Sequence, residues 1–192
     1  MFFAIRCPGC NRVGPAPCGS CISAMSRARD VPVPPGLDDC RALLVHEGPA
    51  RDLVIALKYR HAKEVAKWLG TAMGGLIVRG SVDLVTWAPT SERRRRMRGF
   101  DHAELLAEVV ARHLELPCEG TLRRLPGPPQ TGRTLAERRH GPHFEALTDL
   151  SGRSVVVVDD VVTTGATFRI AGSVMKSAGA DHVVALASAH PL

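Results

Sequence analysis

Residues 155–167 read VVVVDDVVTTGAT. The four valines are typical of a strand that is buried on both faces of a parallel sheet. Asp159 and Asp160 follow at once, and a threonine-rich turn then leads into an expected helix over 165–178. Because ligands of open parallel sheets bind beyond the carboxyl ends of the strands, this stretch predicts a binding site at the end of its strand.

The turn after the aspartates has the composition of a phosphate-binding loop. Its candidate residues are Thr163, Thr164, Gly165, Ala166 and Thr167. The glycine permits a tight backbone turn, inward-facing amides bind an anion, and the helix that follows directs its positive end to the same point. A Walker loop is excluded, because the sequence contains no Gly-Lys-Ser/Thr. The turn therefore predicts a site for one phosphate group.

The two aspartates add a second requirement to the ligand. A bare phosphate would be repelled by Asp159 and Asp160, so the ligand must also carry hydroxyl groups or a bound cation. A sugar phosphate with vicinal hydroxyls meets both demands. The alternative is that the acids only end the strand and cap the helix.

Strand patterns alternate with helix patterns along the rest of the chain. Strands are expected at 40–46, 82–89, 154–159 and 181–189, and helices at 49–60, 62–79, 101–116 and 165–178. This alternation predicts an α/β fold, a Rossmann-like parallel sheet with flanking helices on both faces. Segment 122–145 is polar, contains glycine and proline, and is expected to be a functional loop.

Four cysteines occur early, in two Cys-x-x-Cys pairs. They are Cys7, Cys10, Cys18 and Cys21. Four sulfurs can hold a tetrahedral structural zinc ion with no open position for water. Disulfides, unmetallated thiols and an iron–sulfur cluster are the alternatives. A proline-rich connector over 28–39 follows, so the zinc-binding segment with its connector is placed at 1–36 and the α/β domain at 37–192.

Composition indicates the class of protein, the charge of its partner and its expected location. The 192 residues are 45% hydrophobic and 23% charged, which fits a folded globular chain, and the net charge of +6 favours an anionic partner. No apolar run is long enough for a membrane span, and the apolar start is too short for a secretory signal. We therefore expect a cytoplasmic protein with no membrane span, in which disulfides would be unusual.

These segments together resemble the ComF (competence protein F) family of type I phosphoribosyltransferase-like proteins. Residues 155–167 are similar to the motif that binds phosphoribosyl pyrophosphate. The supporting segments, in the family's order, are the cysteine pairs, ALKYR (56–60), APTSERRRRMRGFDHAELLA (88–107) and QTGRTLAERRHGPHF (130–144). The resemblance covers nearly the whole chain.

The resemblance implies roles for particular residues. Asp159 and Asp160 would bind the ribose diol, and 163–167 would bind the 5-phosphate. The turn over 88–91 would hold pyrophosphate with magnesium, and a loop within 123–140 would close over the site. The other substrate-binding candidates are Pro89, Thr90, Ser91, Arg98 and Arg138. The implied reaction transfers a phosphoribosyl group to an acceptor that the sequence does not name.

Two departures from the family pattern lie near this site. Asp101-His102 stands where the family usually has Asn-Gln, and His140 stands where it usually has Asn. The alternatives to an enzyme are a non-catalytic sensor and a partner of single-stranded DNA or of a DNA-uptake ATPase in natural transformation. The arginine run 93–96 suits either a contact with an anion or a solvated face, and Lys58 either a place at the cleft or an exposed helix end. Scarce aromatic residues, 4% of the chain, argue against stacking on DNA bases. We assign no catalytic role to any histidine.

Overall fold

A four-stranded parallel sheet forms the centre of the molecule, in the order β1-β6-β5-β2. The computed structural model describes residues 4–58, 62–126 and 142–191. The strands are β1 (Asp39–Val45), β2 (Leu84–Trp87), β3 (Leu122–Arg124), β4 (Phe144–Ala146), β5 (Ser154–Val161) and β6 (His182–His190). The helices are α1 (Gly19–Ser23), α2 (Gly48–Ala56), α3 (Ala62–Gly74), α4 (Glu92–Arg98), α5 (His102–Leu114) and α6 (Ala166–Ser177). Strands β3 and β4 pair separately as an antiparallel hairpin.

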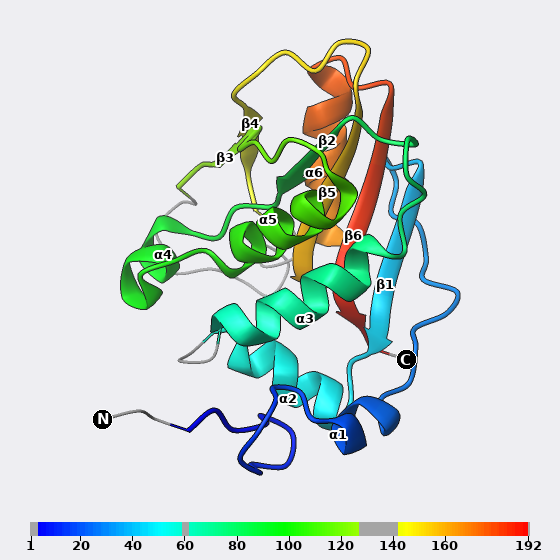
Figure 1. The fold of residues 1–192 in the computed structure, drawn as a ribbon. Helices are drawn as coiled ribbons and strands as arrows, with labels where there is room; N and C mark the ends of the chain where they lie inside the picture. The colour runs from blue at the N-terminus through cyan, green and yellow to red at the C-terminus, as the bar shows by residue number, and fades with distance from the viewer. Residues whose placement is uncertain (1–3, 59–61, 127–141, 192) are drawn as a thin grey trace.

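The valine run of β5 is buried on both faces, as its sequence predicts. Val156 and Val158 belong to a core cluster with α2, α3 and α5, whereas Val155 and Val157 belong to a cluster with α6. Helices α2, α3 and α5 therefore cover one face of the sheet and α6 covers the other (Figure 1). The predicted α/β fold class, a parallel sheet with helices on both faces and a small cysteine-bearing segment before it, is confirmed.

Three local expectations need correction. Strand β5 continues to Val161, two residues beyond the expected end at residue 159, so Asp160 also lies within the strand. The arginine run forms helix α4, which carries no buried residue and so shows no apolar period in the sequence. The segment expected as one loop over 122–145 contains the hairpin strands β3 and β4 at its two ends.

The proline-rich connector lies against the α/β domain. Val45 donates its amide to the carbonyl of Ser26 at 2.9 Å, and Ala28 donates to Leu43 at 3.2 Å, so this segment runs along the free edge of β1. Further on, Pro34 is buried. The division at residue 36 stays a prediction, and the connector is part of the packed structure.

The N-terminal segment lies below α2, at the end of the molecule where the arrows of β1 and β6 finish (Figure 1). Gly9 lies close to both Cys21 and the start of α2. A Cβ atom added at Gly9 would be 3.0 Å from Cys21 Sγ and 3.1 Å from Pro49 Cβ. Pro49 stands in the first turn of α2, as expected. None of the helices in the described ranges is both long and apolar enough to cross a bilayer.

Candidate functional site

A pocket of about 290 Å³ opens at the carboxyl edge of the sheet, at the end of β5. Six predicted site residues line it: Pro89, Thr90, Arg98, Asp159, Asp160 and Thr167. Lys58, Arg94, His102 and Arg124 also line it. The structure therefore brings the acids, the turn after β2 and the start of α6 together around one space.

Asp160 is held by protein groups on both carboxylate oxygens. Its Oδ2 lies 3.0 Å from Lys58 Nζ and 3.2 Å from His102 Nε2, and its Oδ1 accepts the Val161 amide at 2.9 Å. Burial alone would raise the pKa of Asp160, but the hydrogen bond from His102, together with the charge and hydrogen bond of Lys58, holds that pKa well below its usual range. Asp160 is therefore ionised throughout the neutral range.

Asp159 has a different environment. Its Oδ1 accepts the Asp160 amide at 2.8 Å. Burial raises the pKa of Asp159 well above its ordinary value, and the negative charge of Asp160 raises it further. The two adjacent carboxyl groups thus differ strongly in pKa. Such a pair suits a ligand that can form hydrogen bonds with both groups, such as a diol.

His102 links the acids to helix α4. Its Nδ1 lies 3.2 Å from Arg98 Nη1, while its Nε2 faces Asp160. An arginine side chain has only donors, so Nδ1 must accept and Nε2 must carry the proton. Local sequence pattern assigns no role to His102, because its partners Arg98 and Asp160 meet it only in the folded chain. Its signal was the departure from the usual Asn-Gln.

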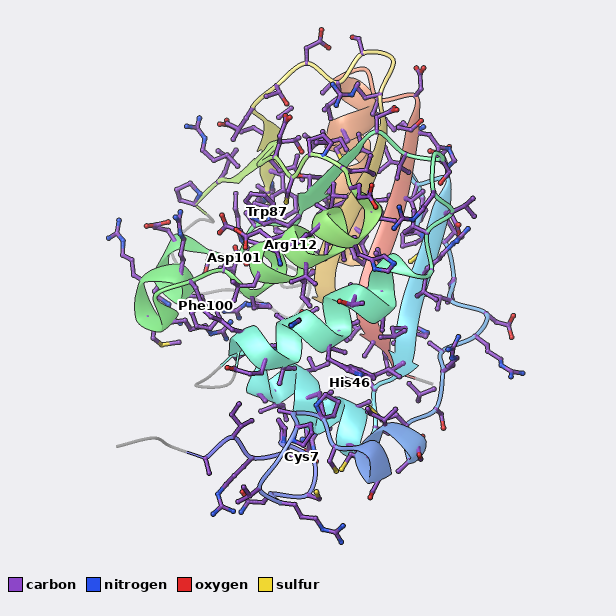
Figure 2. The ribbon with its side chains drawn as sticks, in the orientation of Figure 1. Cys7, His46, Trp87, Phe100, Asp101 and Arg112 are labelled. Atoms are coloured by element: carbon purple, nitrogen blue, oxygen red, sulfur yellow. The ribbon has the colours of Figure 1, made fainter. Side chains whose placement is uncertain are left out.

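The turn after β2 is positioned by the start of α5. Helix α4 ends at Gly99, whose φ of 81° lets the chain turn sharply toward α5. Asp101 then caps α5, with Oδ1 accepting the Ala103 amide at 3.0 Å, while its Oδ2 accepts the Thr90 amide at 2.7 Å. Figure 2 shows Asp101 next to Phe100 at the beginning of α5. Ser91 caps α4 without a side-chain hydrogen bond.

Three arginines make part of the pocket lining, here called the basic wall, positively charged. Arg94, Arg98 and Arg124 come from two different elements and line the same pocket. Burial lowers the pKa of Arg124, and the nearby charge of Arg94 lowers it further. Cations that converge in this way favour a polyanion such as pyrophosphate. Arg94 and Arg98 thus belong to the pocket, whereas Arg93, Arg95 and Arg96 are exposed on α4.

The threonine turn has the predicted backbone geometry. Gly165 adopts φ 70°, in the left-handed region, and stands directly before α6. Thr164 Oγ1 accepts the Ala166 amide at 3.4 Å, and Thr163 and Thr164 are exposed. The first amides of any helix lack intrahelical partners, so those of α6 are available to an anion. Of the predicted phosphate-binding residues in this turn, Thr167 lines the pocket, whereas Thr163, Thr164, Gly165 and Ala166 are not part of its lining.

The four N-terminal cysteines converge. Their sulfurs all lie within 4.8 Å of one another, with 3.6 Å between Cys10 Sγ and Cys18 Sγ, and none forms a disulfide. Cys7 and Cys21 are buried, and Cys7 appears beside α2 in Figure 2. The arrangement can hold one metal ion in a closed set of four ligands.

The thiols also differ in acidity. Despite burial, which would raise it, the pKa of Cys7 falls to about 6 because the backbone amides of Cys18, Cys10 and Gly9 donate to its sulfur. Burial, together with the neighbouring sulfurs, raises the pKa of Cys21 to about 12. Four thiolates cannot share this volume without a cation, which is the charge balance that a thiolate-binding metal supplies. Cys40, outside this cluster, is also buried, and burial raises its pKa to about 11.

One predicted substrate-binding residue, Arg138, falls outside the described residues, as do Gln130, Arg133, Arg139 and His140.

Comparisons with known proteins agree with this geometry. Residues 101–190 match the family described as "Phosphoribosyl transferase domain". "DNA utilization protein YhgH" of Escherichia coli strain K12 is 27% identical over 177 residues, covering 84% of this chain and 73% of that protein. "Competence protein ComFC" of Bacillus subtilis strain 168 is 26% identical over 183 residues, covering 90% and 72%.

Two solved structures are also similar. One, titled "Structure of the allosteric regulatory enzyme of purine biosynthesis", is 24% identical with a TM-score of 0.45, over 64% of this chain and 25% of that one. A purine phosphoribosyltransferase from Pyrococcus horikoshii Ot3 is 17% identical with a TM-score of 0.41, over 61% and 68%.

The parallel sheet and the matched residues define the class of this part of the chain: residues 101–190 resemble a phosphoribosyltransferase domain. The resemblance to the ComF family is confirmed more narrowly by the relatives, which align with most of the chain, and by the cysteine cluster before the domain.

Proposed function

We propose that the chain binds phosphoribosyl pyrophosphate, or a related ribose 5-phosphate ligand, in the pocket at the end of β5 and transfers its phosphoribosyl group to an acceptor. One observation carries the proposal: the acid pair, Thr167 at the start of α6 and the arginines meet at one pocket although they come from distant parts of the chain. A sugar that carries a phosphate at one end and a pyrophosphate at the other matches this distribution of charge.

Each part of the ligand has a complementary group in the proposal. The aspartate side of the pocket faces the ribose hydroxyls, and the amides and hydroxyls of 163–167 receive the 5-phosphate. Thr90, with its neighbours Pro89 and Ser91, and the arginines receive the pyrophosphate. Hydrogen bonds to a charged group contribute about 1.5–3 kcal/mol each, whereas a helix end contributes about 0.3–1 kcal/mol, so amides and side-chain donors dominate.

Magnesium would enter with the substrate. It prefers oxygen ligands, keeps several waters, and is commonly held by substrate phosphates rather than by a cage of protein groups. Bound there, magnesium would neutralise charge on the leaving pyrophosphate.

In the proposed reaction the bond between ribose C1 and the pyrophosphate oxygen breaks, and a bond from C1 to the acceptor forms. The pyrophosphate leaves with the electron pair, so the arginines of α4 stabilise charge that increases during the step. The acceptor loses a proton as the new bond forms.

Calorimetry tests the binding. Titration of phosphoribosyl pyrophosphate with magnesium should give binding heat in the wild-type protein and greatly reduced heat in Asp159→Asn. Asp181→Asn, a change at an exposed position away from the pocket, is the matched control and should bind as the wild type does. Absence of binding heat in the wild type would reject the proposal. Release of pyrophosphate on adding candidate bases or amines would then separate an enzyme from a sensor.

The cysteine cluster is proposed to hold a structural zinc ion, because all four ligand positions would be filled by sulfur. An iron–sulfur cluster uses the same ligands and is the alternative.

A second candidate function is contact with single-stranded DNA or with a DNA-uptake ATPase. Two relatives are named for DNA utilization and competence, and α4 exposes Arg93, Arg95 and Arg96. Replacing these three by alanine should weaken binding of single-stranded DNA at fixed salt while leaving phosphoribosyl pyrophosphate binding unchanged. Equal DNA binding by both proteins would reject a role for this face of α4.

A further inference from the structure

Building on the proposed function, we propose that the two aspartates have separate roles. Asp159 receives the sugar hydroxyls, while Asp160 is a positioning group held in place by His102 and Lys58. This assigns to His102 the part of a positioning residue, and it departs from the expectation that both acids bind the diol.

Most of the hydrogen-bond acceptor sites on the Asp160 carboxylate are already occupied by protein groups. A carboxylate oxygen has two lone-pair sites. On Oδ2, both are taken, by Lys58 Nζ at 3.0 Å and His102 Nε2 at 3.2 Å. On Oδ1, the Val161 amide takes one at 2.9 Å. With its side chain only 13% exposed, Asp160 has little left to offer a ligand.

Asp159 differs from Asp160 in the partners of its carboxylate oxygens. Its Oδ1 accepts one amide, that of Asp160, and within the described residues no hydrogen bond or ion pair reaches its Oδ2. Both acids line the pocket, so the free oxygen of Asp159 is the acceptor that a hydroxyl entering this space would meet. A carboxyl oxygen without another partner keeps its lone-pair sites available to a ligand hydroxyl.

A chain of side-chain contacts holds Asp160 in place. Arg98 donates to Nδ1 of His102, and Nε2 of His102 donates to Asp160. These contacts connect the last residue of α4, the first of α5 and the end of β5. The other groups that face His102 and Asp160 across the pocket are Lys58, which follows α2, and the carboxylate of Asp159. Asp160 thereby connects the basic wall of the pocket to the acidic one.

Glutamine is the informative replacement for His102. Its amide oxygen can accept from Arg98 while its amide nitrogen donates to Asp160, which reproduces both contacts of the neutral imidazole. Leucine has a similar bulk and can make neither contact. A role limited to filling space would be served by both replacements, whereas the positioning role is served by glutamine alone.

The test measures the dissociation constant of phosphoribosyl pyrophosphate with magnesium by calorimetry. Asp159→Asn should weaken binding about 100-fold or more, and Asp160→Asn by about tenfold or less. His102→Leu should weaken binding to about the same extent as Asp160→Asn, and His102→Gln should restore it to within about threefold of the wild type. The double change of Asp160→Asn with His102→Leu should be no worse than the weaker-binding single variant, because both remove one shared interaction.

Several results would overturn the division of roles. They are equal weakening by Asp159→Asn and Asp160→Asn, identical behaviour of the glutamine and leucine variants, and additive effects in the double variant. Thermal unfolding checks that each variant is folded. If His102→Leu does not fold, Lys58→Met removes the other donor from the same oxygen and should weaken binding non-additively with Asp160→Asn. A wild-type protein without affinity for the ligand would reject the proposed function itself, and the division of roles with it.

Discussion

Asp101 holds the backbone of Thr90 with one oxygen and caps helix α5 with the other, at 2.7 Å to the Thr90 amide and 3.0 Å to the Ala103 amide. The side chain is 4% exposed. A residue at the start of one helix thus determines where the turn after β2 lies. This gives a physical role to a position at which the chain departs from the asparagine that is usual in the family it resembles.

Replacing Asp101 by alanine should lower the free energy of unfolding by about 1–3 kcal/mol, because a cap is lost and the buried Thr90 amide is left without a partner. Asparagine keeps only one acceptor oxygen, so Asp101→Asn should lie between alanine and wild type. Urea unfolding measures both. Wild-type stability in Asp101→Ala would contradict the role of the carboxylate.

Gly165→Ala should destabilise the protein and weaken binding of the phosphate end of the ligand. Its φ of 70° disfavours any side chain, and an added Cβ would lie 2.5 Å from Pro34 Cγ. Gly152→Ala is a matched control, since it also has a positive φ of 73° but open space around the Cβ position. Thermal unfolding should show a larger decrease in melting temperature for Gly165→Ala than for Gly152→Ala. Only Gly165→Ala should bind ribose 5-phosphate more weakly.

Removal of metal should unfold the N-terminal segment. Protein purified without chelator should contain about one zinc ion per chain, and a strong chelator should lower the melting temperature, because binding energy at such sites is folding energy. Cys7→Ser should abolish the bound metal, whereas Cys118→Ser, at a half-buried position outside the cluster, should retain it. Visible absorbance with iron in place of zinc would favour the iron–sulfur alternative, and a protein free of metal would reject both.

Acid should weaken the junction between the connector and the sheet. Asp38 accepts the Val183 amide at 2.7 Å and lies 2.7 Å from Lys176 Nζ. Burial would raise the pKa of Asp38, but the hydrogen bonds from Lys176 and Val183 hold it below its ordinary value. A carboxyl group whose pKa falls on folding contributes stability above its unfolded pKa of about 3.9, and this contribution is lost as the pH drops through the folded pKa.

Asp38→Asn should therefore cost about 1 kcal/mol or less at neutral pH, since the side chain is 33% exposed and solvent screens the pair. The difference from the wild type should shrink as the pH falls below about 4. Urea unfolding across this range measures it, and a constant difference would contradict the assignment.

The sequence predicted the sheet, the acid pair and the cysteine cluster because each depends on local pattern. Alternating apolar runs identify strands, and a fixed spacing brings sulfurs together. Helix α4 was missed because it has no buried face, and β3 and β4 because three-residue strands are too short to show a period. His102 and Lys58 act through Asp160, and such contacts between distant segments leave no mark on local pattern.

The contact between Pro34 and Gly165 has a consequence for how the protein can be divided. A fragment that begins at residue 37 would keep every strand of the sheet, yet it would lack the proline ring that covers the turn before α6. Such a fragment would expose to water a surface that the intact chain shields. Ligand affinities measured on it would describe an altered pocket, so the smallest faithful unit for such measurements has to start upstream of that proline.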